Sequence, residues 1–484
     1  MNSRPSRRTG LFDALGASWT SWVMNWLGRY TGRMDRTRDG RNIRLNVLHG
    51  MASMLALNMV QPFIGILAVK YDASNFQVGL LSSAPAVVSL IAMIPGARYV
   101  DRFPRKKRIT ALFMLGHRVF FLLMALIPFF TPDRRAALLI GAIAIMNLPG
   151  AISNVAWQAF VGGIIPPEMR ATAFAARNRL MNVVGTVTVL AVGRVLDWLS
   201  FPLGYQVVFA GAFVMALLEI WVFNHLSEPD PAQSAEWQAR TAAAAATGNS
   251  QPVSSTAATP DAAPGLWSGL RQAAAGIRAH PRFLRYTAAS MAFYLMWQIP
   301  WPLFTLYQVR VLGANNTWVS LLNLANTGGS IVGYGFWADF ADRHGHLHTL
   351  FVASLGIFLV PLAYAFSHSL AMVAAVNLMT GAIFSGVNLS LFNYLLEVTP
   401  EHRRTTYIAY YNTTVNIASI VAPLVGVAFL NWLDFKWAFI LCAALRFVGS
   451  FVFDIVHRVE RAQARRQGLP PAAEVGGAEA APKA

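Results

Sequence analysis

The chain has 484 residues, of which 55% are hydrophobic and only 13% are charged. Soluble proteins carry about 25% charged residues, so this composition excludes an ordinary soluble domain and indicates a polytopic membrane protein. A net charge of +17 would suggest nucleic-acid binding in a soluble protein. In membrane proteins basic residues gather on cytoplasmic loops, which explains the charge without nucleic acid as a partner.

The motifs of several enzyme classes are missing from the sequence. There is no C-x-x-C, H-E-x-x-H or phosphate-loop motif, so neither a metal enzyme nor an ATP-driven pump is supported. We therefore expect no enzymatic activity and no cofactor. The single cysteine, Cys442, excludes an internal disulfide.

The first 44 residues form a basic segment with nine arginines and three acids, and they lack the apolar core of a cleavable signal peptide. Large apolar and aromatic side chains recur there at helical spacing, at Leu11, Leu15, Trp19, Trp22, Trp26 and Tyr30. This pattern predicts an amphipathic helix on the cytoplasmic membrane surface, with a packed soluble helix as the alternative.

Apolar runs bounded by charged or turn residues predict twelve transmembrane helices, because each run is long enough to cross the bilayer. They lie at 45–69, 78–99, 109–130, 136–160, 172–196, 202–225, 284–309, 317–338, 349–366, 370–396, 404–430 and 435–457. The prolines at 300 and 302 predict a kink in the seventh helix.

The predicted helices fall into two groups of six, at 45–225 and 284–457. Residues 226–283 between them are rich in Ala, Ser, Pro and Thr and predict a cytoplasmic linker that is partly disordered. Residues 458–484 end in "QGLPPAAEVGGAEAAPKA", which is rich in Ala, Gly and Pro, and predict a disordered cytoplasmic tail.

The two groups repeat each other in sequence. "VGLLSSAPAVVSLIAMIPGARYVDR" aligns with "VSLLNLANTGGSIVGYGFWADFADR", which pairs Asp101 with Asp342 at an offset of 241. "IPPEMR" aligns with "VTPEHR" at an offset of 233, and "LDWLSF" aligns with "LNWLDF" at an offset of 234. Three matches in the same order, each at an equivalent helix boundary, indicate a duplicated six-helix unit.

The distribution of basic residues fixes the expected orientation. With both chain ends on the inside, 30 of the 39 Lys and Arg lie in inside segments, six lie in outside segments, and three lie within helices. Because cytoplasmic loops carry the excess of Lys and Arg, both termini and the linker are predicted to be cytoplasmic, and the protein is predicted to lie in the plasma membrane.

The loop after the second helix, "ARYVDRFPRK", resembles the motif Gly-x-x-x-Asp-Arg/Lys-x-Gly-Arg-Arg/Lys of the major facilitator superfamily. Asp101, Arg102, Arg105 and Lys106 match, whereas alanine and proline replace the two glycines. The second copy, "ADFADRHGH", matches at Asp342, Arg343 and Gly345. The resemblance covers roughly residues 45 to 457. It implies an all-α integral membrane fold of two pseudo-symmetric six-helix bundles, a monomer, and transport by alternating access.

The resemblance also implies a cytoplasmic gate at these loops. In the family the loop aspartate is thought to meet the amino end of the eleventh helix, where the helix dipole stabilises a negative charge. The gate residues expected here are Asp101, Arg102, Arg105, Asp342 and Arg343. The remaining basic residues of the first loop anchor it to anionic membrane lipid. The alternative is that the basic run serves only as a topology signal.

Transporters of this kind bind their substrate near the midplane of the bilayer, about ten residues into each helix. Asparagines and aromatic residues gather there on several helices. The candidates for substrate binding are Asn58, Asn147, Asn182, Trp297, Gln298, Trp301, Asn326 and Asn416. For any single asparagine, a hydrogen bond between helices is the alternative.

Few ionisable residues lie within the predicted helices. Arg118, Glu219 and Arg446 lie on helices that the family places at the periphery. Arg118 and Glu219 are expected to form a structural pair or to snorkel, and a proton relay is the alternative. His49 and Glu397 are the candidates for carrying a coupling proton, and a hydrogen-bonded structural histidine is the alternative for His49. Helices one, four, seven and ten carry no acidic residue at the midplane.

The sequence therefore predicts a secondary active or facilitative transporter for a small polar organic solute. Because the expected cavity offers amides and aromatic faces without a fixed acid, an uncharged or zwitterionic, sugar-like solute is favoured over a cation. The partners expected are this solute, membrane lipid, and a coupling proton or cation. A multidrug efflux antiporter is the first alternative, although the arginine and the Gly-Pro pair of that group are missing. A transporter-like receptor is the second.

Overall fold

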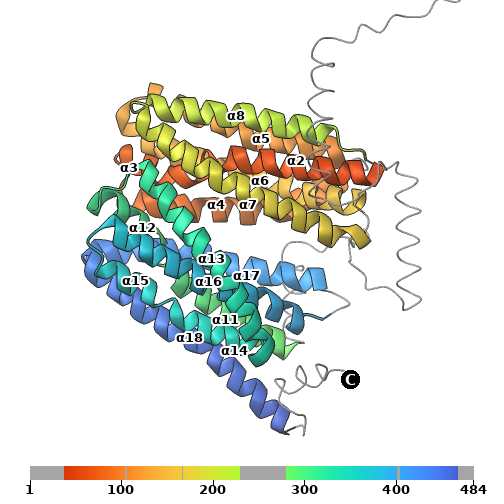
Figure 1. Cartoon of the computed structure of the whole chain (residues 1–484), viewed down its shortest axis with the longest axis vertical. Coiled ribbons are helices and arrows are strands. Elements are labelled where there is room, and N and C mark those ends of the chain that lie inside the picture. Colours follow the sequence, from red (N-terminus) through yellow and green to blue (C-terminus); the bar gives the residue numbers. More distant parts are fainter. Residues whose placement is uncertain (1–37, 104–105, 166, 229–279, 401–403, 467–484) are drawn as a thin grey trace, which may run out of the picture.

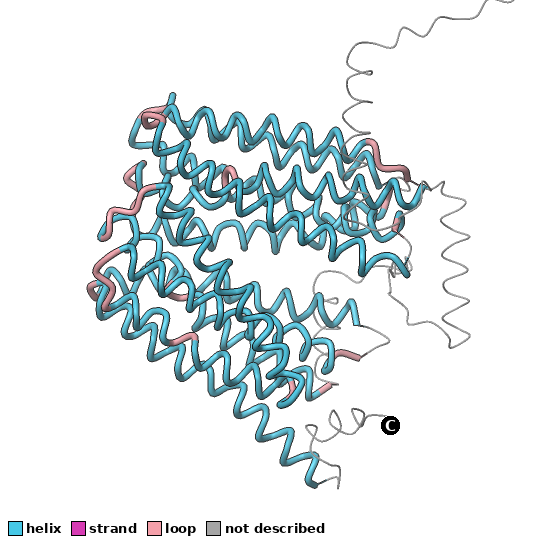
Figure 2. The backbone as a smooth tube through the Cα atoms, viewed as in Figure 1, coloured by secondary structure: helices cyan, strands magenta, loops and turns pink. Residues whose placement is uncertain are grey.

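The computed structural model of the chain describes residues 38–103, 106–165, 167–228, 280–400 and 404–466. Throughout this part the regular structure is helical, as Figure 2 shows. The expected surface helix, the central linker at 229–279 and the last part of the tail lie outside the described residues. Arg105 of the first loop lies outside them too.

The N-terminal bundle is built from six membrane-crossing segments, one for each predicted helix. They are α2 (Arg38–Asn58) continued by α3 (Ile64–Lys70), α4 (Asn75–Asp101), α5 (Lys106–Leu126), α6 (Pro132–Ile164), α7 (Pro167–Trp198) and α8 (Leu203–Asn224). The first segment begins before the boundary predicted at residue 45. These helices run from red to yellow-green in Figure 1.

The C-terminal bundle repeats this order in green to blue (Figure 1). Its helices are α11 (Pro281–Gln298) continued by α12 (Trp301–Leu306), α13 (Asn316–His344), α14 (His346–Gly356) continued by α15 (Leu359–Ala365), α16 (Leu370–Val398), α17 (Arg404–Trp432) and α18 (Phe435–Arg466). The break before α12 falls at Pro300, which confirms the predicted kink.

Ten of these segments are long and apolar enough to cross a membrane on their own composition. The two others are α11 with α12, which is interrupted, and α13, which is rich in Asn, Gly and Ser. The helix α11 packs against α17 and α18, and α13 packs against α16 and against α7 of the N-terminal bundle. The described part of the chain is thus an all-α membrane protein of two six-helix bundles.

Close helix packing in the C-terminal bundle depends on glycine. A Cβ atom at Gly329 of α13 would lie 1.9 Å from the carbonyl oxygen of Leu378, and one at Gly381 of α16 would lie 1.9 Å from that of Asn326. No side chain fits at these distances, so the two backbones touch directly. The contact also draws the Asn326 amide to the carbonyl of Asn377, at 3.3 Å.

Arg446 is buried in the same bundle and donates hydrogen bonds to backbone carbonyl groups at two helix breaks. Its guanidinium donates to the carbonyl of Trp297, just before the break that precedes α12, and to the carbonyl of Ile357, between α14 and α15, at 3.4 Å. Broken helices leave carbonyl groups without intrahelical donors, and an unpaired buried carbonyl is costly. These contacts give Arg446 a structural role.

The last helix, α18, continues to Arg466, beyond the end predicted at residue 457. Two side-chain contacts join this extension to α11. Arg282 donates to Glu460 at 3.1 Å, and Arg285 donates to Gln463 at 2.9 Å. The tail composition did not reveal these contacts because their partners lie 178 residues away in sequence.

Candidate functional site

A cavity of about 820 Å³ lies between the bundles, lined by six helices of the N-terminal bundle and by α17 of the C-terminal bundle. The polar residues that line it are His49, Ser53, Ser89, His117, Arg118, Asn147, Ser153, Asn154, Trp157, Gln158, Arg177, Glu219, Asn412 and Asn416. On α7 and α17 the lining residues lie in the first half of the helix. The cavity therefore lies toward the end of the molecule where α2, α11 and α17 begin, which we call the linker end.

A buried ion pair forms part of the cavity wall. Arg118 of α5 and Glu219 of α8 form a two-pronged contact, with Nε to Oε2 at 2.9 Å and Nη2 to Oε1 at 3.0 Å. Arg118 Nη2 also donates to the hydroxyl of Ser53 at 3.0 Å. Arg118 is 5% exposed and Glu219 is 1% exposed, so neither charge is screened by bulk solvent.

His49 of α2 lies beside this pair. Its Nε2 is 3.7 Å from Oε1 of Glu219, too long for a hydrogen bond but close enough for charge attraction when the ring is protonated. The ring stacks on Trp157 of α6, with centroids 6.3 Å apart, and packs against Phe223. Neither ring nitrogen has a hydrogen-bond partner among the described residues.

Arg177 of α7 completes the group of charges. Its guanidinium carbon lies 4.6 Å from the ring centroid of Trp157, and its Nε is buried without a hydrogen-bond partner in the described structure. The positive charge of Arg177 is attracted to the carboxylate of Glu219 and repels the ring of His49 when that ring is protonated. Glycine lets Arg177 approach α2, because a Cβ atom at Gly50 would lie 2.7 Å from its Nε.

The C-terminal wall of the cavity carries no charge among the side chains that the structure describes. It is formed by Ile408, Asn412, Val415 and Asn416, which follow helical spacing on α17. The N-terminal wall adds further amides on α6, among them Asn147, whose side chain donates to its own helix at 2.7 Å. Amides both donate and accept hydrogen bonds, so this lining suits polar groups such as hydroxyls.

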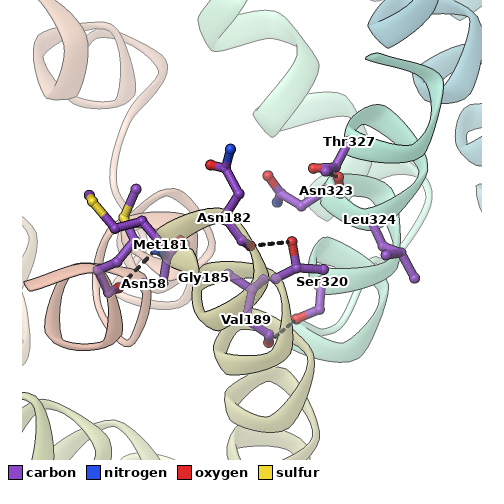
Figure 3. A pocket seen from close by; sticks show the side chains of 11 residues that line it. Asn58, Met181, Asn182, Gly185, Val189, Ser320, Asn323, Leu324 and Thr327 are labelled. Atoms are coloured by element: carbon purple, nitrogen blue, oxygen red, sulfur yellow. Dashed lines mark hydrogen bonds between the residues drawn. The ribbon is translucent and has the colours of Figure 1, made fainter. Parts of the chain in front are cut away.

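A smaller pocket of about 150 Å³ lies farther from the linker end, between α2, α7 and α13 (Figure 3). Asn58 lies in its wall and donates to the carbonyl of Met54 at 2.8 Å. Asn182 of α7 and Asn323 of α13 project from facing helices, as Figure 3 shows. Ser320 donates across the bundles to the carbonyl of Val189 at 2.7 Å.

The predicted substrate residues thus divide into three groups. Asn147 and Asn416 line the larger cavity, and Asn58 and Asn182 line the smaller one. Trp297, Gln298, Trp301 and Asn326 line neither of these two cavities. Trp297 stacks on Phe384 with centroids 4.8 Å apart, and Gln298 is buried. A role of any of these residues in substrate binding stays a prediction.

The predicted gate residues lie at the linker end of α4 and α13. Asp101 is the last residue of α4 and Arg102 follows it, exposed; the described structure does not include the side chain of Asp101. Asp342 and Arg343 are exposed in the last turn of α13. Glu397 is exposed near the end of α16, with His346 at 3.7 Å, and does not line the larger cavity. Neither the gate role nor the proton role is tested by these positions.

At the opposite end, which we call the far end, direct hydrogen bonds join the two bundles. The carboxylate of Asp197, near the end of α7, accepts from the backbone N–H groups of Asn316 and Thr317 at 3.0 and 2.7 Å, at the start of α13. It also accepts from the Asn316 side chain at 2.8 Å, while Tyr205 donates to that side chain at 2.5 Å. A carboxylate beside a helix amino end is stabilised by the helix dipole.

A second contact at the far end mirrors the first. Asn75, at the start of α4, donates to Asn431, near the end of α17, at 2.9 Å. Asn431 follows Asp197 by the repeat offset of 234, and Asn316 follows Asn75 by the repeat offset of 241. Arg310 also crosses the interface and donates to Asn75 at 2.6 Å. These two symmetry-related contacts, here called the latch, tie each bundle to the other.

Sequence reasoning missed several of these residues. Arg177, Trp157 and Asn412 of the cavity, and Asp197 and Asn316 of the latch, were not candidates. One signal was available for the latch, because Asp197 lies inside the repeated "LDWLSF" and "LNWLDF" segments. Within the described residues no group of three His, Cys, Asp or Glu side chains is placed to hold a metal ion.

Comparisons with known proteins agree with this architecture. A crystal structure of a point mutant of the nucleoside transporter NupG superposes with a TM-score of 0.61 at 12% identity, covering 85% of this chain and 99% of that one. An inward-facing, unoccupied structure of a bacterial homologue of the human lysosomal transporter Spinster gives 0.55 at 14% identity, over 87% and 99%. At such identities the likeness shows the fold alone.

A curated relative is also similar over part of the chain. The vacuolar basic amino acid transporter 5 of Saccharomyces cerevisiae is 24% identical over 146 residues, which are 28% of this chain and 25% of the yeast protein. The match thus spans only a quarter of the relative's length. The family model of the Major Facilitator Superfamily matches at 47–288 and again at 286–477, once for each six-helix unit. Because these matches cover most of the sequence, the chain belongs to the major facilitator superfamily.

Proposed function

We propose that the protein moves a small polar organic solute across the membrane by alternating access, with the larger cavity as its binding site. The observation that supports this most is the cavity of about 820 Å³, whose polar walls come from both bundles. The cavity lies toward the linker end, whereas the latch joins the bundles at the far end. Two bundles that rock about such a site expose it to each side in turn.

The basic residues of the sequence support an orientation with the linker end in the cytoplasm of a plasma-membrane protein. The latch then closes the outside, and Asp101 and Asp342 lie at the cytoplasmic end, where the family resemblance implies a second gate. Protease added to right-side-out vesicles is expected to leave residues 228–264 intact, because they face the interior. Cleavage in this segment by external protease would show that the linker faces the outside and would contradict the proposed orientation.

The amide-lined wall of α17 supports a solute that offers several hydrogen-bonding groups. Asn416→Ala is expected to reduce uptake by about fivefold or more, because a lost hydrogen bond to a bound solute costs about 1 kcal/mol and leaves a solute group unpaired. Uptake into proteoliposomes, with solutes chosen by thermal stabilisation of the purified protein, measures this. Asn224→Ala, at an exposed site at the end of α8, is the matched control.

The same experiment separates the alternatives. A multidrug efflux site adapts to many apolar ligands, so Asn416→Ala would shift its preference among them without abolishing transport. A receptor would be stabilised by a ligand that the protein does not move. Equal uptake by wild type and Asn416→Ala would remove α17 from the binding site.

We also propose His49 as the carrier of a coupling proton. It lines the larger cavity, and an imidazole ring can take up and release a proton. The charged groups that face it are Glu219 on α8, Arg118 on α5 and Arg177 on α7, while α6 contributes the neutral Trp157. A pH gradient imposed on proteoliposomes is expected to accelerate uptake by the wild type and not by His49→Gln. Equal acceleration in both would exclude His49.

A further inference from the structure

The cavity wall in the N-terminal bundle has an excess of positive charge. Among the described residues, two arginines, Arg118 and Arg177, line it with a single acid, Glu219. That acid is already engaged, because both of its oxygens accept from Arg118. Arg177 is buried, with 9% of its surface exposed, yet no carboxylate in the described structure is hydrogen-bonded to it. An unpaired buried charge is strongly unfavourable, so such a site favours a ligand that brings the opposite charge.

The unpaired polar atoms of this wall are mostly hydrogen-bond donors. Arg118 Nη1, Arg177 Nε and Trp157 Nε1 are all buried without partners among the described residues. His49 stacks on Trp157 and adds a ring nitrogen that donates when protonated. What this group lacks is an acceptor. A carboxylate or phosphate offers several acceptor oxygens at once, whereas a hydroxyl or an amide oxygen offers fewer and no charge.

We propose that Arg177, Arg118, Trp157 and His49 form a subsite for an oxyanion group of the transported solute, a carboxylate or a phosphate. The inference rests on the proposed function and narrows its substrate class. The oxyanion binds the N-terminal wall, and the rest of the solute meets Asn412 and Asn416 on α17. One solute then contacts both bundles, so its binding favours the state in which they close around it.

The subsite changes the expectation drawn from the sequence. An uncharged or zwitterionic, sugar-like solute was favoured over a cation because no fixed acid was expected at the midplane, whereas the structure places Arg118, Arg177 and Glu219 on the cavity wall. A neutral solute would leave Arg177 unpaired. A cation would meet two arginines and an acid that is already paired. A zwitterion remains compatible, because its carboxylate can fill the subsite.

The test uses the purified full-length protein and probes that share one carbon skeleton. Glucose carries hydroxyls only, gluconate adds a carboxylate, and glucose 6-phosphate adds a phosphate; acetate and inorganic phosphate represent the bare oxyanions. We expect at least one oxyanion probe to raise the melting temperature where glucose does not. The probes distinguish a carboxylate site from a phosphate site. A carboxylate site responds to gluconate or acetate, and a phosphate site responds to glucose 6-phosphate or inorganic phosphate.

The variants assign the response to the subsite. Arg177→Met is expected to weaken the affinity for the effective probe by about ten- to a hundredfold, as lost charge-assisted hydrogen bonds do. The variant breaks no hydrogen bond in the described structure, so it should fold. Arg194→Met, at an exposed position on the same helix, is expected to keep the wild-type affinity. Full retention of the response in Arg177→Met, or stabilisation by glucose alone, would overturn the subsite.

Transport measurements separate failure of the subsite from failure of the proposed function. If proteoliposomes take up a neutral solute and Arg177→Met takes it up equally well, the protein is a transporter and the oxyanion subsite is wrong. If an oxyanion probe binds through Arg177 but no bound probe crosses the membrane, the subsite stands and the transport function is wrong.

Discussion

Glu219→Gln is expected to abolish transport and to destabilise the protein, because it leaves the buried guanidinium of Arg118 without its counter-ion. Removing one partner of a buried ion pair costs about 3–5 kcal/mol, since the remaining charge stays buried and unpaired. The pair lines the cavity with both side chains almost fully buried, so the loss falls on the site and on the packing of α5 against α8. Unfolding of the purified variants in detergent measures the change in stability.

A double-mutant cycle identifies the cause. Arg118→Met combined with Glu219→Leu removes both charges and is expected to restore most of the stability without restoring transport. Glu460→Gln breaks the pair with Arg282, whose side chain is 58% exposed, and is expected to cost less than about 1 kcal/mol. If the double variant is no more stable than the single variants, the two charges do not act as a pair.

Asp197→Asn is expected to loosen the far end and shift the protein away from the state described here. The change removes a charge from the amino end of α13, where an acid contributes about 0.3–1 kcal/mol, and it weakens the hydrogen bonds that this carboxylate accepts from Asn316 and Thr317. A loss of about 1 kcal/mol changes the ratio of the two states about fivefold. Transport should slow, because closing the far end becomes harder.

Distances between spin labels at the far end report the shift. Trp198→Cys and Val311→Cys place labels on exposed positions of the two bundles, and the native Cys442 is buried. Asp197→Asn is expected to enlarge the fraction of long distances, and Asn431→Ala is expected to do so less, because the hydrogen bond between Asn75 and Asn431 joins two neutral side chains. Asp133→Asn, exposed in the first turn of α6 at the same end, is the control. Unchanged distances in Asp197→Asn would exclude the latch as a gate.

The state of the latch also bears on the oxyanion subsite. The subsite lies toward the linker end, and the latch joins the bundles at the far end. A solute that bridges Arg177 and α17 would stabilise closure of the linker end, which competes with closure of the far end in an alternating-access cycle. Bound oxyanion and intact latch are therefore expected to favour opposite states.

The sequence by itself determined the membrane class, the twelve helices, the break at Pro300, the repeat and the family. These features are local or periodic. In a bilayer each segment must satisfy its own backbone hydrogen bonds, so an apolar run of sufficient length predicts a helix without knowledge of its neighbours. The length of α18 was underestimated because its last turns depend on Arg282 and Arg285 of another helix.

Only the tertiary structure decided which polar side chains meet. Arg118 and Glu219 are 101 residues apart, and nothing in either helix alone shows that they pair on the cavity wall. Asn326 satisfied the midplane rule but is bonded to the backbone of α16, because glycines bring that helix into direct contact. The rotation and spacing of a helix are set by the side chains packed against it. For that reason the charge on the cavity wall, and with it the chemistry of the solute, became visible only when the helices were assembled.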